Sequence, residues 1–192
     1  MKRILVVASD KNELKGLPDS FDKAVVGVGP IMAAAGTMYA ALQYEPEVII
    51  SIGSCGSLGR VKKGEVVSFS SVVCPDQNLT AMRLALGTTI DQRRSTVGAL
   101  STGDRTSPYV LSSSAAFTKE VTENLLALHA DCTDMEAYGV GIAARMLEVP
   151  FYAVKLVTDI IGDSSSVGDI SFSLREGRGR LVEKLISLQE VL

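Results

Sequence analysis

Short runs of β-branched and other apolar residues alternate with helical segments along this chain. The runs are bounded by glycine or polar residues, as strands usually are, and they cover 4–8, 24–26, 48–52, 66–73 and 151–154. Helices are expected from Pro30 to about Pro46 and over 115–129, 138–147 and 174–192. The serine triplets 112–114 and 164–166 are expected in loops. This alternation favours an α/β layer fold whose sheet is at least partly parallel.

Length and composition narrow the class of protein. The 192 residues, 46% hydrophobic and 21% charged, suit one core, so a single domain over 1–192 is predicted. The net charge of −3 comes from interspersed acids and bases, which predicts neither nucleic-acid nor membrane partners. No segment approaches the length of a membrane span. The three widely spaced cysteines, Cys55, Cys74 and Cys132, fit reduced thiols in a cytoplasmic protein and predict no metal site.

Two acidic segments follow apolar runs. Asp134-Met135-Glu136-Ala137 precedes the helix over 138–147, and Lys155 to Asp159 follows the run 151–154. Ligand crevices of α/β proteins lie where strands end, so Glu136 and Asp159 are expected to be neighbours. Asp134 could instead cap the helix, with Glu136 favourably placed against the helix dipole, and Asp159 could cap a turn. Because the chain has one histidine, the pair favours chemistry carried by carboxylates.

Two glycine-containing turns also follow strands. Gly27-Val28-Gly29-Pro30 lacks the third glycine of a dinucleotide fingerprint, so we interpret it as a tight turn that brings backbone close to a ligand. The segment 53–59, Gly-Ser-Cys-Gly-Ser-Leu-Gly, lacks the lysine that ends a phosphate-binding P-loop. Its amides could still face an anion or a sugar, or the segment could be a flexible turn. No cofactor is indicated by either turn.

In their order and spacing these segments resemble the nucleoside phosphorylase and nucleosidase superfamily, and most closely the 5′-methylthioadenosine/S-adenosylhomocysteine nucleosidases. The resemblance rests on 27–30, 53–56 with 61–67, 76–82, 101–104, 134–137 and 157–159. It implies a three-layer sandwich with a mixed central sheet flanked by helices. It also implies hydrolysis of the N-glycosidic bond of a purine nucleoside, a small-molecule substrate, by an enzyme that acts as a homodimer.

The resemblance also implies site residues. Asp159 matches the acid that protonates the purine N7, and Glu13 matches the acid that positions the attacking water. Glu136 matches the glutamate that holds the ribose hydroxyls, with Met135 packing on the sugar, and Ser54 matches a serine near the water. The matched turn and strand add further substrate-binding candidates, namely Val28, Lys155 and Thr158. Leu79 and Met82 match a segment that lines the partner subunit's pocket for the 5′-substituent.

The chain departs from this pattern in two places. Lys155 stands where bacterial nucleosidases have arginine, which keeps the charge but loses the bidentate fork. Gly103-Asp104-Arg105-Thr106 stands where the family has a Gly-Asp-Ala run that precedes an adenine-stacking phenylalanine. Asp104 and Arg105 are therefore predicted at the base end of the pocket, where adenine specificity is in doubt.

Three readings of function remain open at this point. Phosphorylases of the superfamily bind phosphate through arginines, one of which is replaced here by Ser51, so water is favoured as the nucleophile. A phosphorylase or hydrolase of another nucleoside, including a futalosine-like one, is the first alternative. The second is a nucleoside-binding protein without turnover, and the joint retention of Glu13, Glu136 and Asp159 argues against it.

Overall fold

A single mixed sheet forms the centre of the protein. The computed structural model describes residues 2–164 and 167–192, and within them the sheet has ten strands. These are β1 (Ile4–Ala8), β2 (Asp22–Val25), β3 (Val48–Ser51), β4 (Ser54–Ser57), β5 (Val66–Ser68), β6 (Ser71–Val73), β9 (Leu100–Ser101), β10 (Val110–Ser113), β11 (Cys132–Asp134) and β12 (Phe151–Ile160). Their order is β2-β1-β3-β12-β4-β11-β10-β6-β9, and β5 pairs separately with β12.

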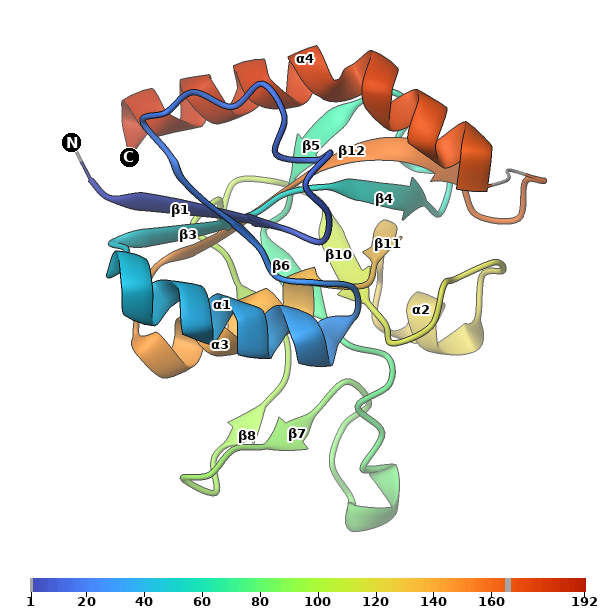
Figure 1. Ribbon diagram of the computed structural model, residues 1–192. Helices are drawn as coiled ribbons and strands as arrows, with labels where there is room; N and C mark the ends of the chain where they lie inside the picture. The colour runs from blue at the N-terminus through green and yellow to red at the C-terminus, as the bar shows by residue number, and fades with distance from the viewer. Residues whose placement is uncertain (1, 165–166) are drawn as a thin grey trace.

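Helices cover both faces of this sheet (Figure 1). The long helix α4 (Val167–Val191) lies on one face, where Leu181 and Leu185 pack into an apolar cluster with β1, β3 and β12. On the other face α1 (Pro30–Tyr44) and α3 (Ala137–Leu147) lie side by side over a second apolar cluster. The short helix α2 (Glu123–Ala127) lies beside β10 and β11. The expected three-layer sandwich with a mixed sheet is thus confirmed.

β12 is the central strand. It is parallel to β3 and β4 and antiparallel to β5, and eight of its ten residues are buried. The run 151–154 predicted this strand, but the strand continues to Ile160 and includes Lys155 and Asp159. Asp159 therefore lies within a strand rather than after its end. Strand β4 lies between β12 and β11, and it is parallel to β12 and antiparallel to β11.

Several boundaries differ from those expected. The run 66–73 forms two strands, β5 and β6, which pair with different neighbours. Ser112 and Ser113 belong to β10, because their small side chains fit the buried centre of the sheet. The helix expected over 115–129 shortens to α2, and α4 begins at 167 rather than 174. Of the triplet 164–166, Ser164 lies outside any helix or strand and 165–166 lie outside the described residues.

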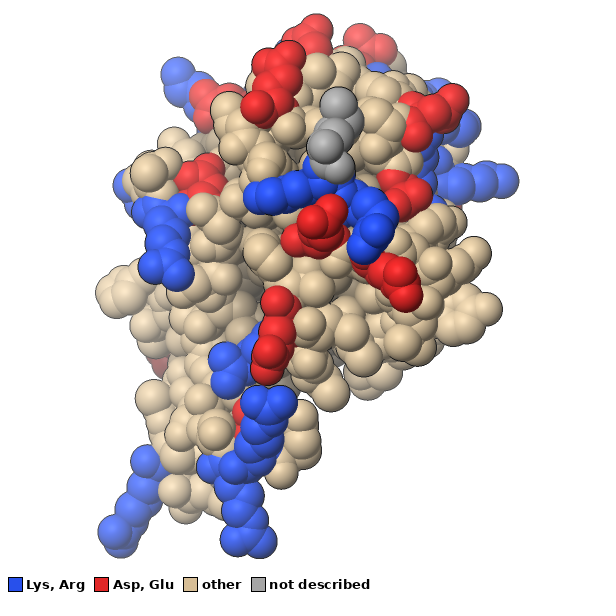
Figure 2. All heavy atoms as spheres, turned by 90° about the vertical axis from the view of Figure 1, so that its left-hand side faces the viewer, with Lys and Arg blue, Asp and Glu red and all other residues tan. Residues whose placement is uncertain are grey.

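Residues 75–99 form an extension that projects from the body of the protein (Figure 1). It contains a 3₁₀ turn (Thr80–Met82) and the hairpin of β7 (Thr89–Ile90) and β8 (Thr96–Val97). On the face shown in Figure 2, lysines and arginines alternate with acids over the body. None of the helices in the described residues is long and apolar enough to cross a membrane.

Candidate active site

A small hollow opens where β4, β11 and β12 meet. Its volume is about 180 Å³, and the loop after β10, the turn before α1 and the first turns of α4 complete its wall. Six of the predicted site residues line it, namely Val28, Ser54, Met135, Glu136, Thr158 and Asp159. Segments that are more than 100 residues apart in the sequence thus meet in one hollow, and the expected proximity of Glu136 and Asp159 is found.

A β-bulge aims Asp159 at this hollow. The pairing between β12 and β4 slips by one residue at Thr158, so that Val157 faces Cys55 while Asp159 faces Gly56. The Thr158 hydroxyl lies 2.8 Å from Asp159 Oδ1. Gly56 gives the carboxylate room, since a Cβ there would lie 3.0 Å from Asp159 Oδ2 and 2.5 Å from the Ile161 side chain. Backbone geometry therefore fixes where the carboxylate points.

Glu136 lies at the start of α3, on the side of the hollow that faces the turn before α1. Its Oε1 accepts a hydrogen bond of 3.0 Å from the backbone N–H of Gly29. Burial raises the pKa of this carboxyl above its usual value, although the positive charge of Lys155 opposes that shift. The second oxygen of Glu136 is available for a ligand, because no hydrogen bond within the described residues engages it.

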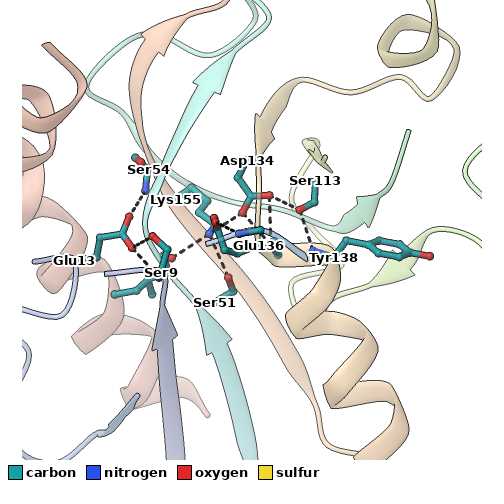
Figure 3. Close-up of polar contacts among 12 residues, drawn as sticks. Ser9, Glu13, Ser51, Ser54, Ser113, Asp134, Glu136, Tyr138 and Lys155 are labelled. Atoms are coloured by element: carbon teal, nitrogen blue, oxygen red, sulfur yellow. Dashed lines mark hydrogen bonds and ion pairs between the residues drawn. The ribbon is translucent and has the colours of Figure 1, made fainter. Parts of the chain in front are cut away.

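Lys155 does not line the hollow. Its side chain lies among Asp134, Glu136 and Ser51 (Figure 3). It is 1% exposed, and its Nζ lies 2.8 Å from Asp134 Oδ2, 3.0 Å from the Ile52 carbonyl and 3.2 Å from Ser51 Oγ. Burial lowers the pKa of this ammonium, but the carboxylates of Asp134, Glu136 and Glu13 together raise it above its usual value. All three ammonium donors therefore have partners inside the protein.

Asp134 completes the network on the other side. It accepts hydrogen bonds from Ser113 Oγ and from the backbone N–H of Ala137, so it caps α3 and pairs with Lys155 at once. The capping role that the sequence suggested for this acid is found. The ion pair was not expected from the sequence, although an acid two residues before Glu136 and a lysine in a buried strand are its signal.

Glu13 lies beside the hollow, in a groove between the loop after β1 and α4. It is 6% exposed, and it accepts hydrogen bonds from Ser9 at 2.8 Å and from the Ser54 backbone N–H at 3.2 Å. Gly53 allows this approach, because a Cβ there would lie 2.6 Å from Glu13 Oε1 and φ is +136°. Ser9 and Ser54 both line the hollow, so they connect Glu13 to it.

Besides Lys155 and Glu13, which adjoin the hollow, four predicted residues do not line it. Asp104 and Arg105 lie at the opposite end of β12, where the backbone N–H of Gly103 donates to the Phe151 carbonyl at 2.8 Å. Phe151 and Asp159 are eight positions apart along the strand, which corresponds to about 26 Å. Leu79 and Met82 belong to the extension, and Met82 is 61% exposed. Neither of these two pairs of residues therefore lies at the Asp159 end of this chain's own hollow, where the base is expected.

An aromatic residue that the sequence analysis passed over lines the hollow. Phe117 follows β10 in the loop before α2, is 51% exposed, and lines the same hollow as Asp159 and Thr118. The run Ser112-Ser113-Ser114-Ala115-Ala116-Phe117 was divided between an expected loop and an expected helix, which hid a strand followed by an aromatic residue. Clusters of three metal-ligating side chains do not occur among the described residues.

Comparison with known proteins agrees with this architecture. A curated relative, the 5′-methylthioadenosine/S-adenosylhomocysteine nucleosidase of Hydrogenovibrio crunogenus, is 27% identical over 165 residues, which are 73% of this chain and 68% of the relative. Among solved structures, the nucleosidase of the same name from Helicobacter pylori, with butyl-thio-DADMe-Immucillin-A, has a TM-score of 0.83 at 16% identity and covers 100% of this chain and 99% of that one.

A second solved structure, the futalosine hydrolase of Helicobacter pylori, has a TM-score of 0.83 at 15% identity, covering 100% of this chain and 98% of that one. At such identities the structures establish the shared fold. The family is established by sequence, since residues 23–187 match the phosphorylase superfamily. Fold, hollow and sequence match agree, and this chain belongs to the phosphorylase superfamily.

Proposed function

We propose that this protein is a nucleosidase that hydrolyses the N-glycosidic bond of a purine nucleoside, with 5′-methylthioadenosine or S-adenosylhomocysteine as the first candidates. The observation that carries the proposal is the meeting of Asp159 and Glu136 in one hollow, although 23 positions and a helix separate them in the sequence. Its support from relatives is that the curated protein from Hydrogenovibrio crunogenus carries this activity in its name.

The proposed reaction uses the carboxylates in sequence. Asp159 gives a proton to N7 of the base, the bond between C1′ and the base nitrogen breaks, and its electron pair leaves with the base. The ribose gains oxocarbenium character, which the negative charge of Glu136 stabilises while it binds the ribose hydroxyls. Glu13 takes a proton from the water that attacks C1′. Free base and free sugar are the products.

Water is favoured over phosphate by the state of Lys155. Phosphate would need cationic donors at the reacting carbon, yet the three donors of this ammonium are taken by Asp134, Ser51 and Ile52. Ser51, where a phosphorylase arginine would stand, is itself a partner of Lys155. The Lys155 charge therefore balances the acids of the site instead of binding a nucleophilic anion.

The base is proposed to stack on Phe117. Phe117 lines the hollow together with Asp159, and stacking of a base on an aromatic ring contributes about 1 to 3 kcal/mol. This proposal replaces the role that the sequence analysis gave to Arg105, which lies at the far end of β12.

Product analysis tests the reaction. The protein is incubated in phosphate-free buffer with 5′-methylthioadenosine, S-adenosylhomocysteine, futalosine and unsubstituted purine nucleosides, and free base and free sugar are quantified. Release of base with one of the first two substrates is expected. A sugar 1-phosphate that forms only when phosphate is added would replace the hydrolase by a phosphorylase. Cleavage of futalosine alone would keep the mechanism and change the substrate.

We further propose that the protein acts as a homodimer. Helix α1 exposes Ile31, Tyr39 and Leu42, which are 81%, 75% and 74% exposed, and Val28 at its start lines the hollow while being 62% exposed. Apolar side chains of this size would be buried by a second copy, and the extension could bring its Leu79 and Met82 to that copy's hollow. Sedimentation equilibrium at micromolar concentration tests this, and a fully active monomer would contradict it.

A further inference from the structure

A groove next to the hollow carries more cationic side chains than the proposed reaction uses. It has a volume of about 670 Å³, compared with about 180 Å³ for the hollow, and it lies between the loop after β1 and the first turns of α4. Ser54 and Ile170 line both spaces, so the two are adjacent. A ligand whose base lies at Asp159 and whose ribose lies at Glu136 would need a substituent on the ribose to reach this groove.

The groove has free donors and occupied acceptors. Lys15, Arg175 and Arg178 line it together with the acids Asp10 and Glu13. Asp10 already accepts hydrogen bonds from Asn12, and Glu13 accepts them from Ser9, Asp10 and Ser54. By contrast, the Nε of Arg178 is buried and has no hydrogen-bond partner among the described residues. No carboxylate within the described residues pairs with the Arg178 guanidinium, so its charge can attract an anion in the groove that it lines.

We propose that this groove is a subsite for an anionic group, a carboxylate or a phosphate ester, carried on the 5′ side of the substrate's ribose. The inference rests on the proposed function, because it takes the orientation of the ligand from Asp159 and Glu136. Arg178 makes the main contact, and Arg175 and Lys15 add positive charge at the mouth of the groove.

A group attached to the substrate fits this site better than free phosphate. Glu13 lies between the cationic side chains of α4 and the hollow, since it lines the groove and is hydrogen-bonded to Ser54. A phosphate dianion close enough to attack C1′ would meet this carboxylate, and like charges at such distances repel. An anion held farther along the groove, at Arg175 and Arg178, avoids that contact.

The test compares three adenine nucleosides that differ at the 5′ position: neutral 5′-methylthioadenosine, adenosine-5′-carboxylic acid and adenosine 5′-monophosphate. Cleavage rates and calorimetric binding are measured in phosphate-free buffer for the native protein, for Arg178→Met and for Arg180→Met. Arg180 is a matched control because it is exposed on the same helix and does not line the groove. Inorganic phosphate is added in a separate arm.

Higher kcat/KM or tighter binding is expected for an anionic nucleoside than for the neutral one. Arg178→Met should lower that preference by about ten- to a hundredfold, the range for a charge-assisted hydrogen bond, whereas Arg180→Met should keep it. Added salt should weaken it. Whether the protein prefers the carboxylate or the phosphate ester then identifies the anionic group that the groove binds.

Three outcomes would overturn the subsite. They are equal kcat/KM and affinity for the three nucleosides, an anionic preference that Arg178→Met leaves intact, and phosphate acting as a co-substrate through Arg178. If none of the three nucleosides is cleaved, calorimetry decides whether the groove binds the anionic forms more tightly, and the product analysis with the wider set of substrates decides the proposed function separately.

Discussion

Two acids lie at opposite ends of β12 in very different structural settings, Asp104 in a loop beside its first residues and Asp159 near its last ones. At one end, Asp104 accepts hydrogen bonds from Ser68, Thr106 and Ser107 within its own neighbourhood. At the other, Asp159 has the Thr158 hydroxyl as its hydrogen-bond donor within the described residues and faces a hollow. An acid whose oxygens are filled locally stabilises a turn, whereas an acid with free oxygens in a hollow can act on a ligand.

The same contrast separates the loops that accompany these ends. The loop 103–106 packs against Phe151 and Tyr152, and it contributes to grooves remote from Asp159. The loop after β10 instead brings Phe117 and Thr118 to the wall of the hollow. Likeness of sequence to a Gly-Asp-containing motif was therefore a weaker guide than position relative to the sheet.

Asp159→Asn should give the largest difference in kcat between substitutions at the two ends of β12. The substitution keeps the shape of the side chain and removes the transferable proton, so kcat should fall by about two to four orders of magnitude, while substrate binding changes less. Asp104→Asn is the matched control at the other end and should leave kcat unchanged. Steady-state kinetics of both variants decide the matter, and near-normal turnover by the Asp159 variant would reduce that carboxyl to a structural role.

Lys155→Met should lower the stability of the protein at the end of β12 that carries Asp159. Removal of the ammonium leaves Asp134 buried without its counter-ion, which costs about 3 to 5 kcal/mol. Thermal unfolding measures this loss. A second substitution, Asp134→Asn, in the same background should recover part of it, because it removes the unpaired charge. If Lys155→Met alone unfolds like the native protein, the pair is not the support that its burial indicates.

Phe117→Ala and Arg105→Phe compare the two loops directly. Loss of the proposed stacking ring should raise KM for the cleaved nucleoside by about tenfold or more, given 1 to 3 kcal/mol per stacked base. Arg105→Phe, which would create a stacking ring at the position that the sequence favoured, should leave KM as it is, because Arg105 lies at the far end of β12. A lower KM for the Arg105 variant would restore the sequence-based assignment.

Glu136→Gln should show the smallest effect on stability, with a defined pH dependence. Burial raises the pKa of Glu136 in the folded protein, so the folded state holds this proton more tightly than the unfolded chain does. The resulting stability is fully present below the unfolded value and is lost as pH rises through the folded value. Glutamine does not titrate, and we therefore expect the variant to unfold at higher temperature than the native protein at neutral pH.

The corresponding gain in the free energy of unfolding should be that of an ordinary substitution, about 1 kcal/mol. It should shrink as the pH falls below the range in which a glutamate usually titrates. Calorimetric scans at neutral and acidic pH give the comparison. A variant that is less stable than the native protein at neutral pH would mean that the Lys155 charge outweighs the burial of Glu136.

Sequence patterns predicted those residues of the candidate site whose acidic side chains follow an apolar run. Apolar runs that end in acids located Glu136 and Asp159, because a carboxylate at the edge of a buried strand is rarely placed by packing alone. The same patterns missed Phe117, since the serines of β10 are buried in the sheet without the hydrophobicity that marks a buried strand. They also missed the role of Asp134, because its partner Lys155 comes from a strand that is not its direct neighbour.

The burial of Lys155 in the middle of β12 has a consequence for how the molecule assembles. A lone ammonium in this strand would carry a large desolvation cost. The packing of β12 between β3 and β4 is therefore stable only when Asp134 of β11 is in position to pair with Lys155. We therefore expect these strands to form and to open as one cooperative unit. Native-state hydrogen exchange would then give the amides of 132–134 and 151–157 a common opening free energy, and Lys155→Met would lower it for both.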